Sequence, residues 1–187
     1  MRLRFLLLLA FVPLASLPAQ AFVQVLGNGR AHECYLAAKA GSDADAALRL
    51  CDQALRDEAL NRRDRAATFV NRGVIRIAKD QVDEAMADYA AGIALAPDLG
   101  DAYVNRGVAL IRLQRYDSAL ADIDKGIALG SSPPHLGYYD RALVEERMGR
   151  YREAYYDFKH VLELAPDFQP AADELKYYSV VKTPDPG

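Results

Sequence analysis

The feature that most constrains this chain is a repeat with a period of about 34 residues. The stretch DEAMADYAAGIALAPD (83–98) matches DSALADIDKGIALGSS (117–132) and REAYYDFKHVLELAPD (152–167). Ala85, Ala119 and Ala154 occupy the same slot, at spacings of 34 and 35 residues, and DAALRLCDQAL (45–55) is a weaker copy. A fixed period of this length indicates stacked supersecondary units that bury their apolar faces against each other.

Each unit contains two segments with the apolar spacing of an amphipathic helix. The first helices are predicted at 65–79, 102–113 and 136–148, and the second helices at 82–96, 116–129 and 151–164. Pro97 and Pro166 end two of the second helices, because proline cannot continue a helix. Residues 169–178 are predicted to form one further capping helix, and residues 179–187 a disordered tail.

The residues that recur in these units resemble the signature of the tetratricopeptide repeat family. Its aromatic, small, alanine, aromatic and proline slots hold Phe69, Gly73, Ala85, Tyr89 and Pro97 in the first clear unit. The later units hold Tyr103, Gly107, Ala119 and Ile123, with the proline displaced, and then Tyr138, Ala142, Ala154, Phe158 and Pro166. The resemblance implies an all-α, right-handed superhelical solenoid of about four units over residues 22–178. We expect units at 28–65 (degenerate), 66–99, 100–134 and 135–168, and a cap at 169–178.

The first 21 residues have the layout of a signal peptide. A basic start with Arg2 and Arg4 precedes an apolar run, and small residues end in Ala19-Gln20-Ala21. We expect cleavage after Ala21 and a periplasmic or secreted, bacterial-type protein without membrane insertion. The alternative is an uncleaved membrane anchor, although the apolar run is shorter than the roughly 20 residues that span a bilayer.

Net charge and cysteine content limit the kinds of partner, cross-link and metal site that the sequence predicts. The net charge is -3, which argues against nucleic acid because phosphate binding needs a basic face. Cys34 and Cys51 are the two cysteines, and an even number in an exported protein predicts a disulfide. The alternative is that both are inert core residues of a cytosolic protein. The scattered histidines predict no metal site.

The dipeptide Asn-Arg recurs at 71–72 and 105–106, and its two side chains point about 100° apart on a helix. The family resemblance implies that the asparagine side faces a concave groove. The expected groove residues are Val70, Asn71, Val74, Ile77, Val104, Asn105, Val108, Ile111, Arg112, Tyr139, Asp140 and Leu143. Asn71 and Asn105 resemble the peptide-binding asparagine ladder of related repeats, whereas Asp140 departs from it. A carboxamide offers a donor and an acceptor to a peptide backbone of any sequence.

Two alternatives to an open groove are left by the sequence. Asn71 and Asn105 are also suited to bracing backbone between units. The mostly apolar groove suits an apolar or amphipathic peptide, and the alternative is that the FVQVL segment (22–26) or the C-terminal cap occupies it.

The arginine of each unit is matched by a periodic aspartate. Asp88, Asp122 and Asp157 follow Arg72, Arg106 and Arg141 by sixteen residues in every unit. Because guanidinium binds carboxylate bidentately, we expect a structural ladder of ion pairs along the stack.

The sequence contains none of the motifs of a common enzyme. It has no H-E-x-x-H, G-x-S-x-G or phosphate-binding loop, so we expect no catalysis, cofactor or small-molecule substrate. The expected function is an exported scaffold that binds a protein or peptide segment. Alternatives are an assembly subunit of a cell-envelope complex, using the solenoid ends or convex face, and glycan binding through the tyrosines of the last unit.

Overall fold

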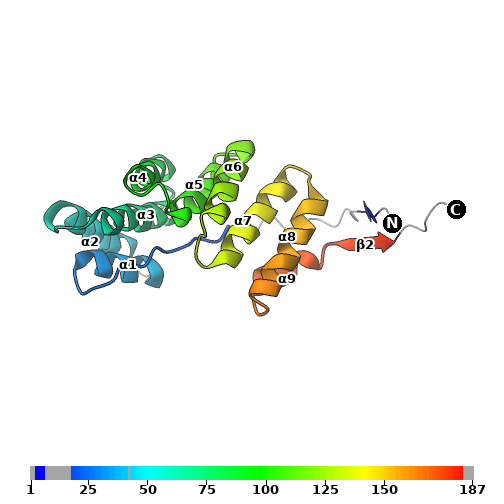
Figure 1. Cartoon of the computed structure of the whole chain (residues 1–187), viewed down its shortest axis with the longest axis horizontal. Coiled ribbons are helices and arrows are strands. Elements are labelled where there is room, and N and C mark those ends of the chain that lie inside the picture. Colours follow the sequence, from blue (N-terminus) through cyan, green and yellow to red (C-terminus); the bar gives the residue numbers. More distant parts are fainter. Residues whose placement is uncertain (1–2, 7–17, 42, 183–187) are drawn as a thin grey trace.

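A computed structural model places the helical pairs in a single row (Figure 1). It describes residues 3–6, 18–41 and 43–182. The helices are α1 (Arg30–Ala40), α2 (Ala44–Asp57), α3 (Arg62–Ala78), α4 (Val82–Leu95), α5 (Gly100–Arg112), α6 (Tyr116–Ala128), α7 (Pro134–Arg147), α8 (Tyr151–Leu164) and α9 (Gln169–Leu175). Successive pairs stack from α1–α2 at one end to α7–α8 at the other, with α9 against α8, so the chain is an all-α solenoid.

Close approach within each pair depends on the glycines of the first helices. A Cβ atom on Gly73 would lie 2.5 Å from the Tyr89 ring, and one on Gly107 would lie 2.5 Å from Ile123 Cγ1. Both distances are far inside van der Waals contact, so a larger residue would require the buried side chain opposite it to move. Tyr89 and Ile123 are fully buried, which explains why the repeat retains a small residue opposite a large one.

A disulfide joins the two helices of the degenerate unit. Cys34 of α1 and Cys51 of α2 are bonded, with their Cα atoms 4.9 Å apart. Both are fully buried, together with Ala38, Ala47 and Ile75 of α3. The predicted pairing is therefore present, and it supports the unit that matches the repeat least well.

The ends of the chain form a short two-stranded sheet outside the solenoid. Strand β1 (Leu3–Leu6) pairs antiparallel with β2 (Ser179–Lys182). The second strand occupies part of the tail that the sequence predicted to be disordered, and its Val180 and Val181 favour extended backbone. Residues 7–17 of the expected signal peptide, with most of its apolar run, and the last five residues (183–187) lie outside the described residues.

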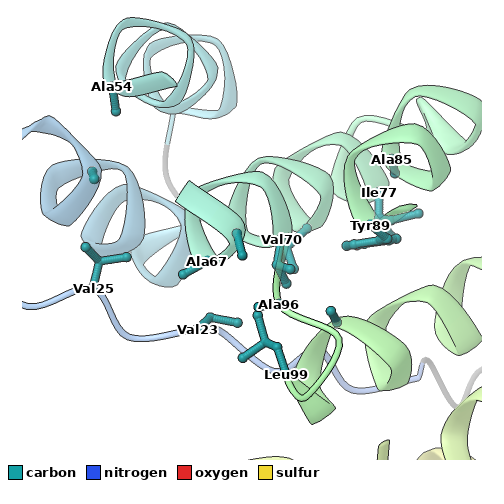
Figure 2. Close-up of a cluster of buried hydrophobic side chains, with 14 of the residues drawn as sticks. Val23, Val25, Ala54, Ala67, Val70, Ile77, Ala85, Tyr89, Ala96 and Leu99 are labelled. Atoms are coloured by element: carbon teal, nitrogen blue, oxygen red, sulfur yellow. The ribbon is translucent and has the colours of Figure 1, made fainter. Parts of the chain in front are cut away.

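Residues 18–26 form an extended segment that runs along one face of the solenoid before α1 begins. In Figure 1 this blue segment passes beside α7, α5 and α3. Figure 2 shows Val23 on this segment beside Ala67 of α3 and Leu99, the residue before α5. Val23 and Val25 belong to the same buried cluster as Ala67 and Leu99.

Candidate functional site: an extended segment held by an asparagine ladder

Two buried asparagines hold the backbone of the extended segment. Asn71 Oδ1 accepts a hydrogen bond from Val23 N (2.9 Å), and its Nδ2 donates to Val23 O (2.8 Å). Asn105 makes the same pair with Ala21, at 3.2 Å from N and 2.7 Å to O. Both asparagine side chains are fully buried. Each carboxamide pairs with the backbone N–H and C=O of one residue, as a neighbouring β-strand would.

Asp140 occupies the third slot of this ladder with different chemistry. Its Oδ1 accepts a hydrogen bond from Ala19 N at 2.7 Å, but a carboxylate has no donor for Ala19 O. Its Oδ2 is buried and has no hydrogen-bond partner among the described residues. Burial raises the pKa of Asp140 well above its usual range, and the Ala19 amide lowers it only in part.

The register between segment and ladder is regular. Ala19, Ala21 and Val23 alternate along the strand, whereas their partners Asp140, Asn105 and Asn71 come from successive repeats. Two residues of extended chain span about 7 Å, so successive units present their ladder residues at about that step. The segment runs from α7 toward α3, and it ends where Val25 O accepts a hydrogen bond from His32 Nδ1 of α1.

The opposite edge of the segment faces an open cavity. The backbones of Gln20, Phe22 and Gln24 make no hydrogen bond with any described residue. These residues border a cavity of about 930 Å³. Its walls also include Leu26, Tyr35, Lys39, Asn61, Arg63, Asp64, Ala67, Leu99, Asp101, Ser132, Pro133 and Leu136. The groove is therefore filled on its ladder side and open on the other.

The structure differs from the sequence prediction at Val70 and Val104. A Cβ atom on Gly92 would lie 3.0 Å from Val70 Cγ2, and one on Gly126 would lie 2.5 Å from Val104 Cγ2. Both valines therefore pack against the second helix of their own unit and do not line the groove. The reason is the 100° step of the helix, which separates each valine from the asparagine that follows it.

The other predicted groove residues are mostly buried between helices. Val74 and Ile77 lie in the cluster around Tyr89, and Ile111 lies with Ile123. Val108 is fully buried. Arg112 is partly exposed, and its Nη1 lies 3.5 Å from Asp80 Oδ1. Tyr139 and Leu143 lie in a cluster with Phe158 and Phe168, against which Ala19 also packs. Of the predicted set, Asn71, Asn105 and Asp140 hydrogen-bond to the segment.

Sequence reasoning missed the residues that complete the site. Leu99 and Leu136 border the cavity, and His32 binds the end of the segment. Residues 19–21 were assigned to a signal peptide, although Ala19, Ala21, Val23 and Val25 alternate with Gln20, Phe22 and Gln24. That period of two is the signal of an extended strand with one buried face.

The three arginines form the expected bidentate pairs with the periodic aspartates. Nε and Nη2 of Arg72 donate to Asp88 (3.0 and 2.6 Å), those of Arg106 to Asp122 (2.6 and 2.7 Å), and those of Arg141 to Asp157 (2.6 and 2.8 Å). Each pair joins the two helices of one unit. It does not run along the stack, so that part of the prediction is corrected.

Different aspartates connect neighbouring units. Nη1 of Arg72 donates to Asp52 of α2 (2.6 Å), and Nη1 of Arg141 donates to Asp124 of α6 (2.8 Å). The equivalent position for Arg106 is Ala90 of α4, which offers no acceptor side chain. The joint between α4 and α5 therefore lacks the ion pair that the flanking joints have.

Two kinds of feature are absent from the described part of the chain. No group of three or more His, Cys, Asp or Glu side chains able to hold a metal ion occurs within it. None of the described helices is long and apolar enough to cross a membrane.

Comparisons with known proteins agree with the repeat architecture. A tetratricopeptide repeat family model matches residues 100–129 and 137–168. A search of curated protein sequences finds no match. Similar solved structures include the first TPR of Spaghetti (RPAP3) bound to HSP90 peptide SRMEEVD, which is 27% identical with a TM-score of 0.57, over 61% of this chain and 90% of that chain.

Two further structures extend the comparison. The Arabidopsis OM64 TPR domain is 25% identical with a TM-score of 0.58, over 62% of this chain and 95% of that one. MamA, at 18% identity and a TM-score of 0.60, covers 81% of this chain and 94% of its own, and shows the fold alone. Residues 100–129 and 137–168 are therefore tetratricopeptide repeats, and the other helix pairs share the fold of the TPR domains to which the chain is similar.

Proposed function

We propose that this protein is an exported scaffold that binds an extended polypeptide in its concave groove. The observation that carries the proposal is the pair of hydrogen bonds that each of Asn71 and Asn105 makes to the backbone of one residue. These bonds involve no side chain of the bound segment, so they suit any sequence whose alternate residues are small enough to enter. The proposal assigns the protein no catalytic role, cofactor or small-molecule substrate.

A similar domain supports this class of partner. The RPAP3 domain with 27% identity was solved with a peptide of HSP90. While residues 1–21 are retained the groove holds residues 19–25, so an external polypeptide must then displace part of this segment or bind beside it. The cavity of about 930 Å³ next to Gln20 and Phe22 provides room for the second course.

The export part of the proposal rests on the sequence and on the disulfide. A bond between Cys34 and Cys51 suits an oxidising compartment. Cleavage after Ala21 would remove two ladder-bound residues, Ala19 and Ala21, and keep Val23 in place. The intact mass of the protein purified from the periplasm tests this directly, and a mass that retains residues 1–21 contradicts it.

A second candidate function is that of an assembly subunit that uses its convex face or its ends. The specific observation in its favour is that the ladder is already occupied by the chain itself. In that case residues 19–25 are a permanent part of the fold, and partners contact other surfaces.

Cross-linking in the native compartment distinguishes the two candidates. We expect the double variant Asn71→Ala, Asn105→Ala to lose its partners. The matched control is Arg106→Ala, which removes the bidentate pair with Asp122 and lowers stability without altering the groove. If the double variant retained its partners, the result would contradict the groove proposal and favour the assembly role.

A further inference from the structure

The two ends of the groove hold the segment with unequal strength. At the α3 end, Val23 and Val25 are buried in the core, and Val25 O accepts a hydrogen bond from His32 Nδ1 of α1. At the α7 end, the residues in the groove are alanines, and Ala19 is only partly buried. Apolar burial contributes roughly 25 cal/mol per Å², so the small alanine side chains add little. Residues 19–21 are thus the weakly held part of the segment.

Ala19 satisfies only part of the hydrogen-bonding capacity of the Asp140 carboxylate. The side chain is fully buried, one oxygen accepts the Ala19 amide, and the other has no partner among the described residues. A buried carboxylate without a counter-charge is costly, so this site favours a ligand that supplies more donors or a positive charge. The carboxylate faces the segment, since its other oxygen is bonded to Ala19 N.

We propose that Asp140 and Asn105 form a binding site for the free amino terminus of a polypeptide whose first and third residues are small. An α-ammonium in the place of Ala19 N would supply three donors and a positive charge to the carboxylate. The third residue would take the place of Ala21 and pair with both groups of the Asn105 carboxamide. This inference rests on the proposed groove function and specifies its ligand.

The surroundings set the size and direction of this ligand. Ala19 packs against the cluster that holds Tyr139 and Phe168, whose ring centroids lie 5.2 Å apart, so a ligand with a small first residue reproduces the observed contact. The direction is that of the bound segment, from α7 toward α5. Beyond the third residue, the ligand would leave the ladder through the cavity lined by Leu99, Asp101 and Leu136.

The site can be vacated in the full chain by proline substitution. Proline has no N–H, so Ala19→Pro with Ala21→Pro removes the donors to Asp140 and Asn105. The matched control is Gln20→Pro, because the Gln20 amide makes no hydrogen bond with any described residue. Circular dichroism of both variants establishes that the helices are retained.

The test is a titration of these full-length chains with Ala-Gln-Ala-amide, followed by NMR. We expect the double-proline variant to bind it at least about tenfold more tightly than the wild type or the Gln20→Pro control. Acetylation of the peptide's amino group is expected to weaken binding about tenfold, because the charge-assisted bonds are lost. Adding Asp140→Asn to the double-proline variant should abolish the difference between the free and acetylated peptides.

Three results would overturn the inference. Equal binding of the acetylated peptide means that the site does not select an amino terminus. Equal binding to the Gln20→Pro control places the peptide elsewhere, and absence of binding to the double-proline variant excludes the site. Each leaves the groove function standing if the cross-linking experiment with Asn71→Ala, Asn105→Ala shows lost partners, so the two failures are distinguishable.

Discussion

The α3 end and the α7 end of the groove share the same ladder geometry, but their hydrogen bonds to the segment are complete at one end and incomplete at the other. At the α3 end, Asn71 satisfies both backbone groups of Val23, a residue 8% exposed. At the α7 end, Asp140 satisfies one backbone group of Ala19 and retains an unpartnered oxygen. A repeated slot therefore makes one fully paired contact and one half-paired contact, through the change from asparagine to aspartate and from valine to alanine.

The largest effect is expected from reducing the disulfide that supports the α3 end. Closing a loop between residues seventeen apart contributes about 3 kcal/mol in the chain-entropy model. Urea unfolding with and without reductant measures the loss, which should occur without abolishing the fold. Hydrogen exchange should show the Val23 amide losing more protection than the Ala21 amide. An unchanged unfolding midpoint with both thiols demonstrably free would contradict this expectation.

Removing each asparagine compares the α3 end with the middle of the ladder, where Asn105 of α5 holds Ala21. Asn71→Ala leaves the buried backbone of Val23 without partners and should lower the free energy of unfolding by about 2 kcal/mol. Asn105→Ala should cost about 1 kcal/mol, because residues 19–21 can move toward water. Chemical denaturation of the two full-length variants gives both values. Equal losses, or a larger loss at Asn105, would contradict the weaker hold on residues 19–21.

Asp140→Asn is expected to make the α7 end behave like the α3 end. Burial raises the folded-state pKa of Asp140, so its contribution is fully present below the unfolded pKa of about 3.9 and is lost as pH rises through the raised value. Asparagine does not titrate and can also donate to Ala19 O. We expect the variant to be more stable by about 1 kcal/mol at pH 8 and to lose this advantage near pH 4.

Unfolding experiments across this pH range check the expectation. A wild-type minus variant difference that is independent of pH would show that Asp140 does not titrate as its burial implies. In that case the unpartnered oxygen would carry no argument for a cationic ligand.

The smallest effect is expected at the joint between α4 and α5. Ala90→Asp would give Arg106 the cross-unit partner that Asp52 gives Arg72 and Asp124 gives Arg141. An exposed ion pair contributes about 0.5 kcal/mol and is weakened by salt. Ala90→Asn is the control without charge, and equal denaturation midpoints for the two variants would contradict the assignment.

Local periodicity was enough to predict most of the fold. The 34-residue repeat predicts the helix pairs, and the sixteen-residue spacing predicts the three bidentate arginine pairs. Gly73 opposite Tyr89 follows from the same alignment. These features were predictable because each lies within one repeat, where sequence spacing determines spatial neighbours.

Contacts between repeats and with the N-terminal segment were not predictable in the same way. The partnership of Arg72 with Asp52 depends on how one unit rotates against the next. Residues 19–21 match both a signal-peptide cleavage site and an alternating extended strand. The sequence alone does not say which of the two patterns determines their role. Val70 was misplaced because one residue's error in a helix rotates a side chain by 100°.

Residue-resolved amide hydrogen exchange on the full chain tests the central claim most directly. The ladder predicts alternation: the amides of Ala21 and Val23, which are bonded to Asn105 and Asn71, exchange slowly, whereas those of Gln20, Phe22 and Gln24 exchange rapidly. Val23 should be the slowest of these. Uniformly rapid exchange from residue 19 to residue 25 would contradict the account, because it would show that the asparagines do not hold this segment.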